Sequence, residues 1–353
     1  MGPEIFYLYT IDPYTCDPDT TGLHLPVRDN LPHRGAMPAK TIAAIIPLHN
    51  GARWIEGALD SILSQTLKPD EVIAVDDGST DDGAGSRIVA DLARKHAVTL
   101  LHKENGGQSS ARNHGVAHAT SDLIALLDQD DAWYPNHLAD LIRPFHQNRR
   151  SKQLGWVYSD LEEVDDTGAM VQHRLLTTLP ARHPKRSLGE CLSQDMFVLP
   201  SASLICARAF AAVGGFDPRL CGYEDDDLFL RLFRAGYDNI FIPTALSKWC
   251  IRPDSTSYTT RMSTSRMICA LKLAEKFPND KKRRRFGEYL IAIEECDKSR
   301  MYRAAKELRL VASFLGLRKR LTLKALMSLM GNYRLARAIH HSRLAFKLAA
   351  WLR

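Results

Sequence analysis

Three aspartates stand at the end of an apolar run in this sequence. Residues 123–135 read LIALLDQDDAWYP, so that Asp128, Asp130 and Asp131 directly follow five apolar residues. Carboxylates this close repel one another unless a proton or a cation lies between them. Mg²⁺ and Mn²⁺ prefer oxygen ligands, and Mg²⁺ is typically held by one or two carboxylates together with substrate phosphates. The segment therefore predicts either a divalent-metal site or a solvated acidic turn.

The alternation of side chains along a strand indicates which of these carboxylates act together. If the strand continues through the acids, Asp128 and Asp130 point to one side and Asp131 points to the other. We therefore expect Asp128 and Asp130 to share a cation. Asp131 is expected to cap or orient the loop instead.

Three further segments carry residue types suited to binding or catalysis. VDDGSTDD (75–82) combines acids with turn residues, as an ordinary strand-to-helix connection also does. NGGQSSARNHG (105–115) has a glycine pair that lets the backbone approach a ligand, and Arg112 follows where it could steady a phosphate. GYEDDDLFLRLFRAG (222–236) places four acids before an amphipathic helix, which is more than the helix dipole requires. One of the four could act as a general base on a hydroxyl group.

Alternating strands and helices must position these segments. Apolar runs predict strands and a period near 3.6 predicts helices. The expected strands are 41–50, 71–80, 98–103 and 122–131, and the expected helices are 54–66, 86–96, 109–119 and 137–147. This alternation indicates an α/β fold with a mixed, mainly parallel sheet flanked by helices. Ligands bind such sheets at the carboxyl ends of the strands, where both VDD and DQDD lie, so we expect these acids to form one site.

The pattern changes towards the end of the chain. Further strands are expected over 154–160, 203–207 and 239–243 with a helix over 227–236, and from about residue 260 only helical patterns follow. We therefore divide the chain into three parts. These are an irregular arm (1–40), an α/β domain (41–260) and a basic helical extension (261–353).

Charge distinguishes the extension from the rest of the chain. The net charge is +6, yet residues 281–353 hold 19 Lys and Arg against 5 Asp and Glu, which leaves the preceding part acidic. RLARAIHHSRLAFKLAAWLR, near the end, is amphipathic and basic. Such a segment suits an anionic membrane surface, or it packs as a helical cap on the domain. No recognition motif accompanies the charge, so we expect no nucleic-acid partner.

Cysteine usage and hydropathy indicate a compartment. Seven scattered cysteines without a CxxC pair argue against a disulfide framework or a zinc site and favour a reducing environment. The first residues lack the features of a signal peptide, and no apolar run reaches the ~18 residues of a membrane span. We expect a cytoplasmic protein, with peripheral contact to the inner face of the cell membrane if the extension binds there.

Taken in order, these motifs resemble those of one family. The segments are similar to inverting nucleotide-sugar glycosyltransferases of bacterial family 2, which have the GT-A fold. They are IIPLHNGARWIEGALDSILSQTLKPDEVIAVDDGSTDD, ENGGQSSARNHG, LLDQDDAWYP, VGGFDPRL and EDDDLFLRL, and the resemblance runs from about residue 41 to 257. It implies Mn²⁺ or Mg²⁺ as cofactor and a nucleoside-diphosphate sugar as donor, with UDP as the expected nucleotide. It further implies a hydroxyl acceptor on a glycan or lipid-linked glycan, as in cell-surface polysaccharide synthesis.

The resemblance also implies roles for donor-binding residues. Pro47 and His49 should border the nucleotide base, and Asp77 should hydrogen-bond it. Asp130 should be the direct metal ligand, and Asp128 should share the metal while lying nearer the ribose or the sugar.

For the chemistry, the resemblance implies that Asp225 is the catalytic base and that Arg231 supports the site. Relatives often carry a histidine in a segment like YRxHPGSxS, whereas this chain reads WCIRPDSTS with Arg252 at that place. Arginine cannot ligate a metal but can clamp a diphosphate. Either metal coordination has fewer ligands here, or Arg252 takes over part of the diphosphate clamp. Trp133 is expected either to stack on an acceptor sugar or to anchor its loop in the core.

Two other functions fit parts of this pattern. A sugar nucleotidyltransferase would share the sheet and the metal, but its GxGxRL-type loop is replaced here by PLHNGARW. A nucleotide- or glycan-binding module without catalysis would not need the full set of Asp77, Asp128, Asp130 and Asp225. We therefore favour the glycosyltransferase hypothesis.

Overall fold

The computed structural model describes residues 40–147, 153–179, 181–192 and 195–252, together with eight positions between Met262 and Phe277. The predicted arm, apart from its last residue, lies outside the described residues. So do the predicted boundary at residue 260 and the extension beyond Phe277.

Four parallel strands form the first half of the sheet, in the order β3-β2-β1-β4. Each of the first three is followed by a helix, as the alternating pattern predicted. The strands are β1 (Ile42–Leu48), β2 (Glu71–Asp77), β3 (Val98–Lys103) and β4 (Leu123–Leu126), and the helices are α1 (Ile55–Leu63), α2 (Ala84–Ala93) and α3 (Gln108–His118).

The second half of the sheet is mixed. The strand order continues as β4-β8-β6-β9-β5. β8 pairs antiparallel with both β4 and β6, and β9 pairs parallel with β6. β5 pairs antiparallel with β9, and β7 pairs antiparallel with β6. These strands are β5 (Ala132–Trp133), β6 (Leu154–Val164), β7 (Met170–Gln172), β8 (Ser203–Cys206) and β9 (Asp238–Cys250). The helices are α4 (His137–Gln147), α5 (Leu175–Thr178), α6 (Leu188–Cys191), α7 (Ala207–Ala212) and α8 (Glu224–Arg234), with a 3₁₀ turn, η1 (Pro200–Ala202).

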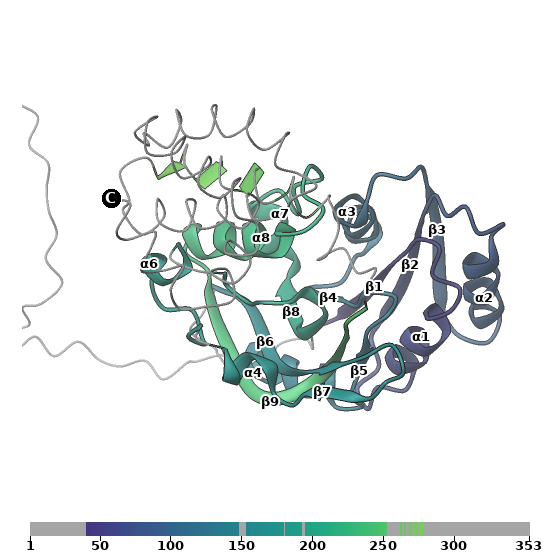
Figure 1. The fold of residues 1–353 in the computed structure, drawn as a ribbon, viewed down its shortest axis with the longest axis horizontal. Coiled ribbons are helices and arrows are strands. Elements are labelled where there is room, and N and C mark those ends of the chain that lie inside the picture. The colour runs from purple at the N-terminus through teal and green to yellow at the C-terminus, as the bar shows by residue number, and fades with distance from the viewer. Residues whose placement is uncertain are drawn as a thin grey trace, which may run out of the picture. The chain divides into compact units, whose positions relative to one another are not determined.

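Two hydrophobic clusters cover the two faces of the sheet. Because side chains alternate along a strand, Ile45 of β1 packs with α3 and α8, whereas Ile46 packs with α1 and α4. Figure 1 shows α3, α7 and α8 on one side of the sheet and α1 and α4 on the other. Burial on both faces explains why the first strands read as continuous apolar runs.

A glycine sets the close approach of α3 to the sheet. A Cβ atom at Gly115 would lie 2.5 Å from Cγ2 of Ile45, so any larger residue would push the helix away. α3 carries Arg112, and its distance from the sheet therefore fixes the depth of that side chain.

The acids of DQDD lie in a turn rather than on a strand. β4 ends at Leu126, where its pairing with β1 also ends, and the backbone N–H of Asp131 donates to the carbonyl of Asp128 at 3.0 Å. The prediction that strand alternation places Asp128 and Asp130 on one side was therefore wrong. One further bond joins the N–H of Leu127 to the carbonyl of Ile45, and the chain then turns away although β1 continues to Leu48.

Some described residues of the predicted extension contact the α/β domain. Cys269 and Leu273 are buried in the same cluster as α8. Nζ of Lys272 lies 2.5 Å from Asp227 of α8 and 2.8 Å from Asp217. Among the residues the structure describes, no helix has the length and apolar character needed to cross a bilayer.

Candidate active site

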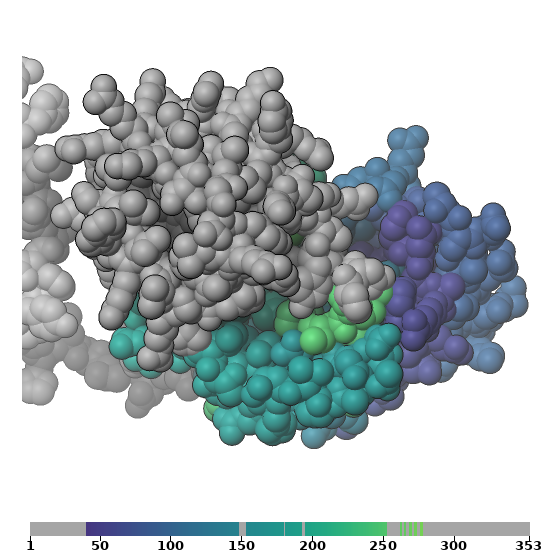
Figure 2. Space-filling view, in the orientation of Figure 1, coloured from purple at the N-terminus to yellow at the C-terminus, as the bar shows by residue number. Residues whose placement is uncertain are grey.

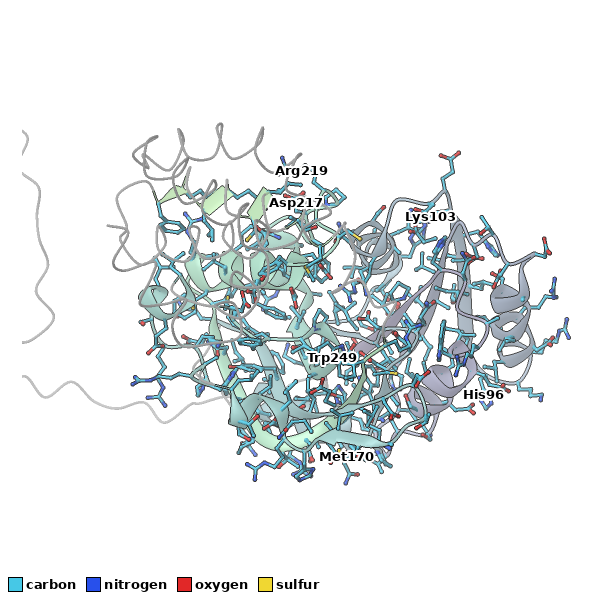
Figure 3. All side chains as sticks on the ribbon, viewed as in Figure 1. His96, Lys103, Met170, Asp217, Arg219 and Trp249 are labelled. Atoms are coloured by element: carbon cyan, nitrogen blue, oxygen red, sulfur yellow. The ribbon has the colours of Figure 1, made fainter. Side chains whose placement is uncertain are left out.

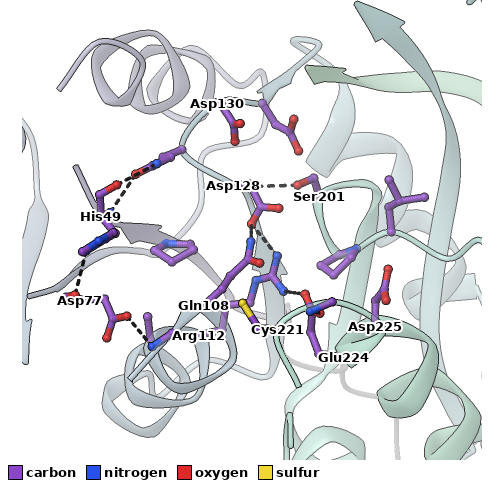
Figure 4. Close-up of a pocket in the computed structure, with 18 of the residues that line it drawn as sticks. His49, Asp77, Gln108, Arg112, Asp128, Asp130, Ser201, Cys221, Glu224 and Asp225 are labelled. Atoms are coloured by element: carbon purple, nitrogen blue, oxygen red, sulfur yellow. Dashed lines mark hydrogen bonds and ion pairs between the residues drawn. The ribbon is translucent and has the colours of Figure 1, made fainter. Parts of the chain in front are cut away.

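A cavity of about 330 Å³ lies at the carboxyl ends of the parallel strands. Its lining combines residues from β1, β2, α3 and the acidic turn with residues from η1, α8 and the segment after β9. Every side chain predicted for donor binding, metal binding or catalysis lines it: Pro47, His49, Asp77, Arg112, Asp128, Asp130, Asp225 and Arg252. Figure 4 shows His49 and Asp77 on one side of this cavity and Glu224 and Asp225 on the other.

Asp77 organises one end of the cavity. Its carboxylate pairs with Nζ of Lys103 at 2.5 Å and accepts the backbone N–H groups of Gly106 at 3.0 Å and Gly107 at 2.7 Å. Gly107 has φ +84°, a conformation that favours glycine, and it precedes the first residue of α3. The glycine pair therefore lets the loop fold over Asp77, and Asp77 in turn fixes the start of α3.

His49 lies beside Asp77 at the exposed end of β1. Its Nδ1 is 3.1 Å from the carbonyl oxygen of Asp77 and 3.2 Å from Nδ2 of Asn105. Its backbone N–H donates to Oε1 of Gln129 at 2.9 Å. The ring thus stands where β1, the glycine loop and the acidic turn meet.

Arg112 bridges two carboxylates deep in the cavity. One nitrogen lies 2.6 Å from Oδ1 of Asp128 and another lies 2.9 Å from Oε1 of Glu224, while the side chain is 1% exposed. Burial works against the charged form, but the two carboxylates outweigh it and raise the pKa of Arg112. The guanidinium predicted to steady a phosphate is therefore engaged in holding the site together.

Asp128 is held by three side chains from two elements, α3 and η1. Nε2 of Gln108 donates to its carboxylate at 2.8 Å, in addition to Arg112, and its backbone N–H donates to Oγ of Ser201 at 3.2 Å (Figure 4). η1, which carries Ser201, thus tethers the acidic turn from the side opposite α3.

Asp130 and Asp131 bond to the end of β9. Asp130 pairs with Arg252 at 2.6 Å, and Asp131 accepts the backbone N–H of Cys250 at 3.0 Å. Burial, followed by the charge of Asp128, raises the pKa of Asp130, while Arg252 opposes this shift. Burial and the two neighbouring aspartates raise the pKa of Asp131. The prediction that Asp131 orients the loop is confirmed by this bond to β9.

The four acids of EDDD occupy the first turn of α8 and have different partners. Glu224 accepts from Arg112 and from the backbone N–H of Gly222, and Asp226 accepts from the backbone N–H of Met196. Asp227 pairs with Arg231 and Lys272. These contacts hold α8 in the fold. Glu224 and Asp225 both line the cavity, and the carboxylate of Asp225 accepts the backbone N–H of Asp226.

The surroundings of Asp225 favour its protonated form more than water does for an exposed aspartate. Burial, followed by the charge of Glu224, raises the pKa of Asp225 to about 7, against the opposing effect of Arg112. A carboxylate with a pKa near the working pH is well matched to accepting and releasing a proton.

Arg231 contacts no cavity atom but supports the loop before α8. Besides Asp227 it donates to the carbonyl oxygens of Val213 and Gly215. Phe216, a residue of this loop, forms two hydrogen bonds with the side-chain amide of Asn113 in α3. Its backbone N–H donates to Oδ1, and its carbonyl accepts from Nδ2. The supporting position expected for Arg231 agrees with this geometry.

Trp133 anchors the loop after the acids in the core. It is 5% exposed, its Nε1 donates to the carbonyl of Ser201 at 2.8 Å, and its ring stacks on His137 with centroids 4.5 Å apart. The alternative in which it stacks on an acceptor sugar was wrong, because the side chain does not reach the cavity.

Sequence reasoning missed several side chains that shape the cavity. In the sequence, Gln108 is distinguished only by its place after the glycine pair, and Ser201 belongs to none of the motifs. Trp249 of β9 lines the cavity, and Trp54 lies under the guanidinium of Arg252 with 4.0 Å from Cζ to the ring centroid. In Figure 3, Trp249 lies in the interior of the view, whereas Met170 of β7 lies at its lower margin.

The donor set for a metal consists of two carboxylates. Asp128 and Asp130 stand two residues apart on one turn facing the cavity, and no cluster of three or more His, Cys, Asp or Glu side chains suited to a metal occurs within the described residues. Such a pair fits Mg²⁺ or Mn²⁺ only if other oxygens complete the shell, as substrate phosphates typically do. The residues present therefore fit a divalent ion that binds together with a phosphate-bearing ligand.

Comparison with solved structures defines the fold class. Staphylococcus aureus TarS 1–349, solved in complex with UDP-GlcNAc, superposes with a TM-score of 0.59 at 17% identity, covering 85% of this chain and 88% of that chain. The Pyrobaculum calidifontis mannosyltransferase PcManGT, solved with GDP-Man and Mn²⁺, superposes with a TM-score of 0.52 at 21% identity, covering 87% of each chain. The chain has the GT-A glycosyltransferase fold.

Sequence comparison finds one family over part of the chain. Residues 43–211 match the model described as glycosyl transferase family 2. An uncharacterized glycosyltransferase of Rickettsia bellii is 32% identical over 197 residues, which is 55% of this chain and 27% of that protein. Chondroitin synthase of Pasteurella multocida is 28% identical over 223 residues, which is 60% of this chain and 20% of that protein. Residues 43–211 are therefore similar to the family 2 glycosyltransferases.

The family match concerns one domain of longer relatives. The chain matches 27% to 58% of the length of the five rickettsial relatives. The family model covers residues 43–211, which include the parallel strands and the acidic turn of the cavity.

Proposed function

We propose that the chain is a metal-dependent inverting glycosyltransferase. It transfers a sugar from a nucleoside-diphosphate donor, with UDP as the expected nucleotide, to a hydroxyl of a glycan or lipid-linked acceptor. The observation that carries this proposal is that Asp225 shares one cavity with the Asp128–Asp130 pair and with the His49–Asp77 end.

The nucleotide base binds at the end formed by Pro47, His49 and Asp77. Asp77 accepts three hydrogen bonds from the protein, and an ionised carboxylate has about four acceptor positions, so one remains for a donor group of the base. Asn105 and the ring of His49 add polar groups at the same end. Uracil, with one ring N–H and two carbonyls, suits this set.

The diphosphate lies next to the acidic turn. Asp130 and Asp128 would hold Mn²⁺ or Mg²⁺, which when bound offsets the negative charge that develops on the departing diphosphate. Arg252 lies beside Asp130 and supplies a guanidinium that can bind two phosphate oxygens at once.

Asp225 acts on the acceptor. As the acceptor oxygen attacks the anomeric carbon, Asp225 takes the hydroxyl proton, a new glycosidic bond forms and the bond to the diphosphate breaks. Attack from the face opposite the leaving group inverts the configuration at that carbon. The pKa of about 7 leaves Asp225 largely ionised at slightly alkaline pH, as a base requires.

The acceptor enters at the end of the cavity that lies beyond Asp225. Tyr223, Trp249 and Met262 line the cavity together with Asp225 and give it aromatic and apolar surface. Aromatic rings offer the flat apolar face on which the C–H side of a sugar packs. TarS and PcManGT carry UDP-GlcNAc and GDP-Man in their solved complexes, which supports a nucleotide-sugar donor and keeps GDP as the second candidate.

A donor screen tests the proposal. The full chain is incubated with UDP-, GDP- and dTDP-sugars with Mn²⁺ or Mg²⁺, and both thermal shift and nucleotide release are measured. We expect one UDP-sugar to stabilise the protein and to be slowly hydrolysed, and Asp130→Ala to remove both effects. If no nucleotide sugar binds or is cleaved and Asp130→Ala changes nothing, the proposal fails.

The same screen separates the alternatives. A sugar nucleotidyltransferase would release pyrophosphate from a nucleoside triphosphate and a sugar 1-phosphate. A non-catalytic module would bind a nucleotide sugar without releasing nucleotide. Either result would replace the proposed reaction.

The proposed setting is the cytoplasm, at the inner face of the membrane where lipid-linked acceptors are exposed. Residues 281–353, with 19 basic residues against 5 acidic ones, would supply the contact to anionic lipid. Flotation with phosphatidylserine vesicles tests this. Equal flotation by a chain ending at residue 280 would contradict the proposed role of the extension.

A further inference from the structure

Arg252 pairs with Asp130, which together with Asp128 forms the metal motif proposed above. Its guanidinium lies 2.6 Å from Oδ2 of Asp130, and the two side chains are 12% and 18% exposed. The same guanidinium lies over the ring of Trp54. A partly buried pair of this kind is screened by solvent much less than a surface pair.

The backbone holds the two partners next to each other. Asp131 accepts the N–H of Cys250, the last residue of β9, so the acidic turn is bonded to the strand two residues before Arg252. Ala132 and Trp133 pair with Lys248 and Ser247, which extends this contact. In Figure 2 the green residues near the end of β9 lie against the purple N-terminal segment. The pairing of Arg252 with Asp130 therefore follows from the register of β5 and β9.

Both carboxylates of the metal motif are thus already compensated by arginine. Asp128 pairs with Arg112 and accepts from Gln108, and Asp130 pairs with Arg252. Arg112 is fully buried and also bound to Glu224, so it cannot leave without disrupting α8. Arg252 is the cation that can be exchanged.

We propose that Arg252 is an internal competitor for the divalent ion at Asp130, and that the diphosphate of the donor ends the competition by taking Arg252 as its own partner. This inference rests on the proposed function and adds a prediction of how the metal affinity depends on the nucleotide. The ion alone binds weakly, and the ion and the nucleoside diphosphate strengthen each other.

The direction follows from charge balance. A divalent ion placed at Asp130 without nucleotide would leave a guanidinium that is mostly desolvated beside two added positive charges. When a diphosphate is present, Arg252 can pair with phosphate oxygens, and Asp130 becomes available to the ion. Thermodynamic linkage then requires the ion to raise nucleotide affinity by the same factor.

The test measures metal affinity without turnover. Free Mn²⁺ is titrated by electron paramagnetic resonance against the full chain in the absence of nucleotide. We expect Arg252→Gln to bind Mn²⁺ about tenfold more tightly than the wild type, within the usual range of coupling between sites. Asp130→Asn in the Arg252→Gln background should abolish the gain, which locates the site.

Two matched variants control for charge and for folding. Arg53→Gln makes the same substitution at a 66% exposed side chain over the same tryptophan ring and should leave Mn²⁺ affinity unchanged. Arg252→Lys keeps the positive charge but loses the planar group stacked on Trp54, so its Mn²⁺ affinity should lie between those of the wild type and Arg252→Gln. It also tests the proposal if the glutamine variant does not fold, because the weaker pair with Asp130 should already bind Mn²⁺ more tightly than the wild type does.

A second titration adds UDP or GDP at saturation. We expect the nucleotide to raise the Mn²⁺ affinity of the wild type and to raise that of Arg252→Gln by a smaller factor. Equal affinity of wild type and Arg252→Gln for Mn²⁺ without nucleotide, including no measurable binding by either, would overturn the inference. Failure of UDP and GDP to bind would instead overturn the proposed function, because the comparison without nucleotide does not depend on it.

Discussion

The guanidinium of Arg112 lies 2.6 Å from the carboxylate of Asp128, and through this contact α3 holds the acidic turn. Its other nitrogen binds Glu224, the residue next to the predicted base. One buried cation therefore fixes the two halves of the site in relation to each other.

Arg112→Gln is expected to destabilise the fold strongly. Removing one partner of a buried ion pair leaves charged carboxylates without compensation and typically costs about 3–5 kcal/mol. Urea unfolding followed by circular dichroism measures the loss. Arg94→Gln, which removes a pair between side chains that are 78% and 64% exposed, should cost less than ~1 kcal/mol and serves as control. Equal effects of the two variants would contradict the bridging role.

Asp225→Asn is expected to reduce kcat by about 10²–10⁴-fold, because general-base catalysis is lost while donor binding remains. The variant should not be less stable. The raised pKa of Asp225 means that the folded protein binds this proton more tightly than the unfolded chain, so wild-type stability falls as pH rises from about 4 to about 7. Asn does not titrate. We therefore expect the melting temperature of the variant to exceed that of the wild type more at pH 8 than at pH 5.

The pH profile of kcat/KM should show an acid limb near pH 7. Asp225 must be ionised to accept a proton, so activity rises with pH through its pKa of about 7. Glu224→Gln removes the negative neighbour that raises this pKa and leaves Arg112 to lower it. The acid limb of Glu224→Gln should therefore lie at lower pH than that of the wild type. A limb that stays in place would show that another group controls it.

Trp133 and Trp249 should respond differently to substitution by alanine. Trp133→Ala removes a buried ring and its hydrogen bond to Ser201, which typically costs about 3–5 kcal/mol. Trp249→Ala removes a partly exposed ring from the cavity and should raise the KM for acceptor while sparing donor hydrolysis. Urea unfolding and initial-rate kinetics distinguish the two. An unchanged acceptor KM would remove Trp249 from the acceptor site.

Local patterns in the sequence were sufficient for the first half of the fold. The strands through Ile45 and Val75 are buried on both faces and therefore read as apolar runs, and α1 and α2 show the period of helices with one buried side. Because parallel strands end at one edge of a sheet, the acids that follow them could be assigned to one site before their contacts were known.

The remaining features depend on contacts between distant segments. β4 ends at Leu126 although β1 continues to Leu48, so the acids lie in a turn that no property of DQDD itself indicates. Ser201 reaches Asp128 only because β8 inserts antiparallel beside β4. Arg112 and Glu224 are 112 residues apart, and their pairing depends on how α8 docks against α3. The spacing of residues along the sequence does not indicate contacts between such distant segments.

The position of β9 has a consequence for how the protein is made. Asp130 and Arg252 are 122 residues apart, and the N–H that donates to Asp131 belongs to the last residue of β9. The ribosome therefore synthesises Asp130 and Asp131 well before these two partners, and contacts of such separation form late. We expect stalled nascent chains that expose residues 1–235 to remain sensitive to protease, and those that expose residues 1–277 to become resistant. Protease resistance of the chains that expose residues 1–235 would mean that the acidic turn folds without β9.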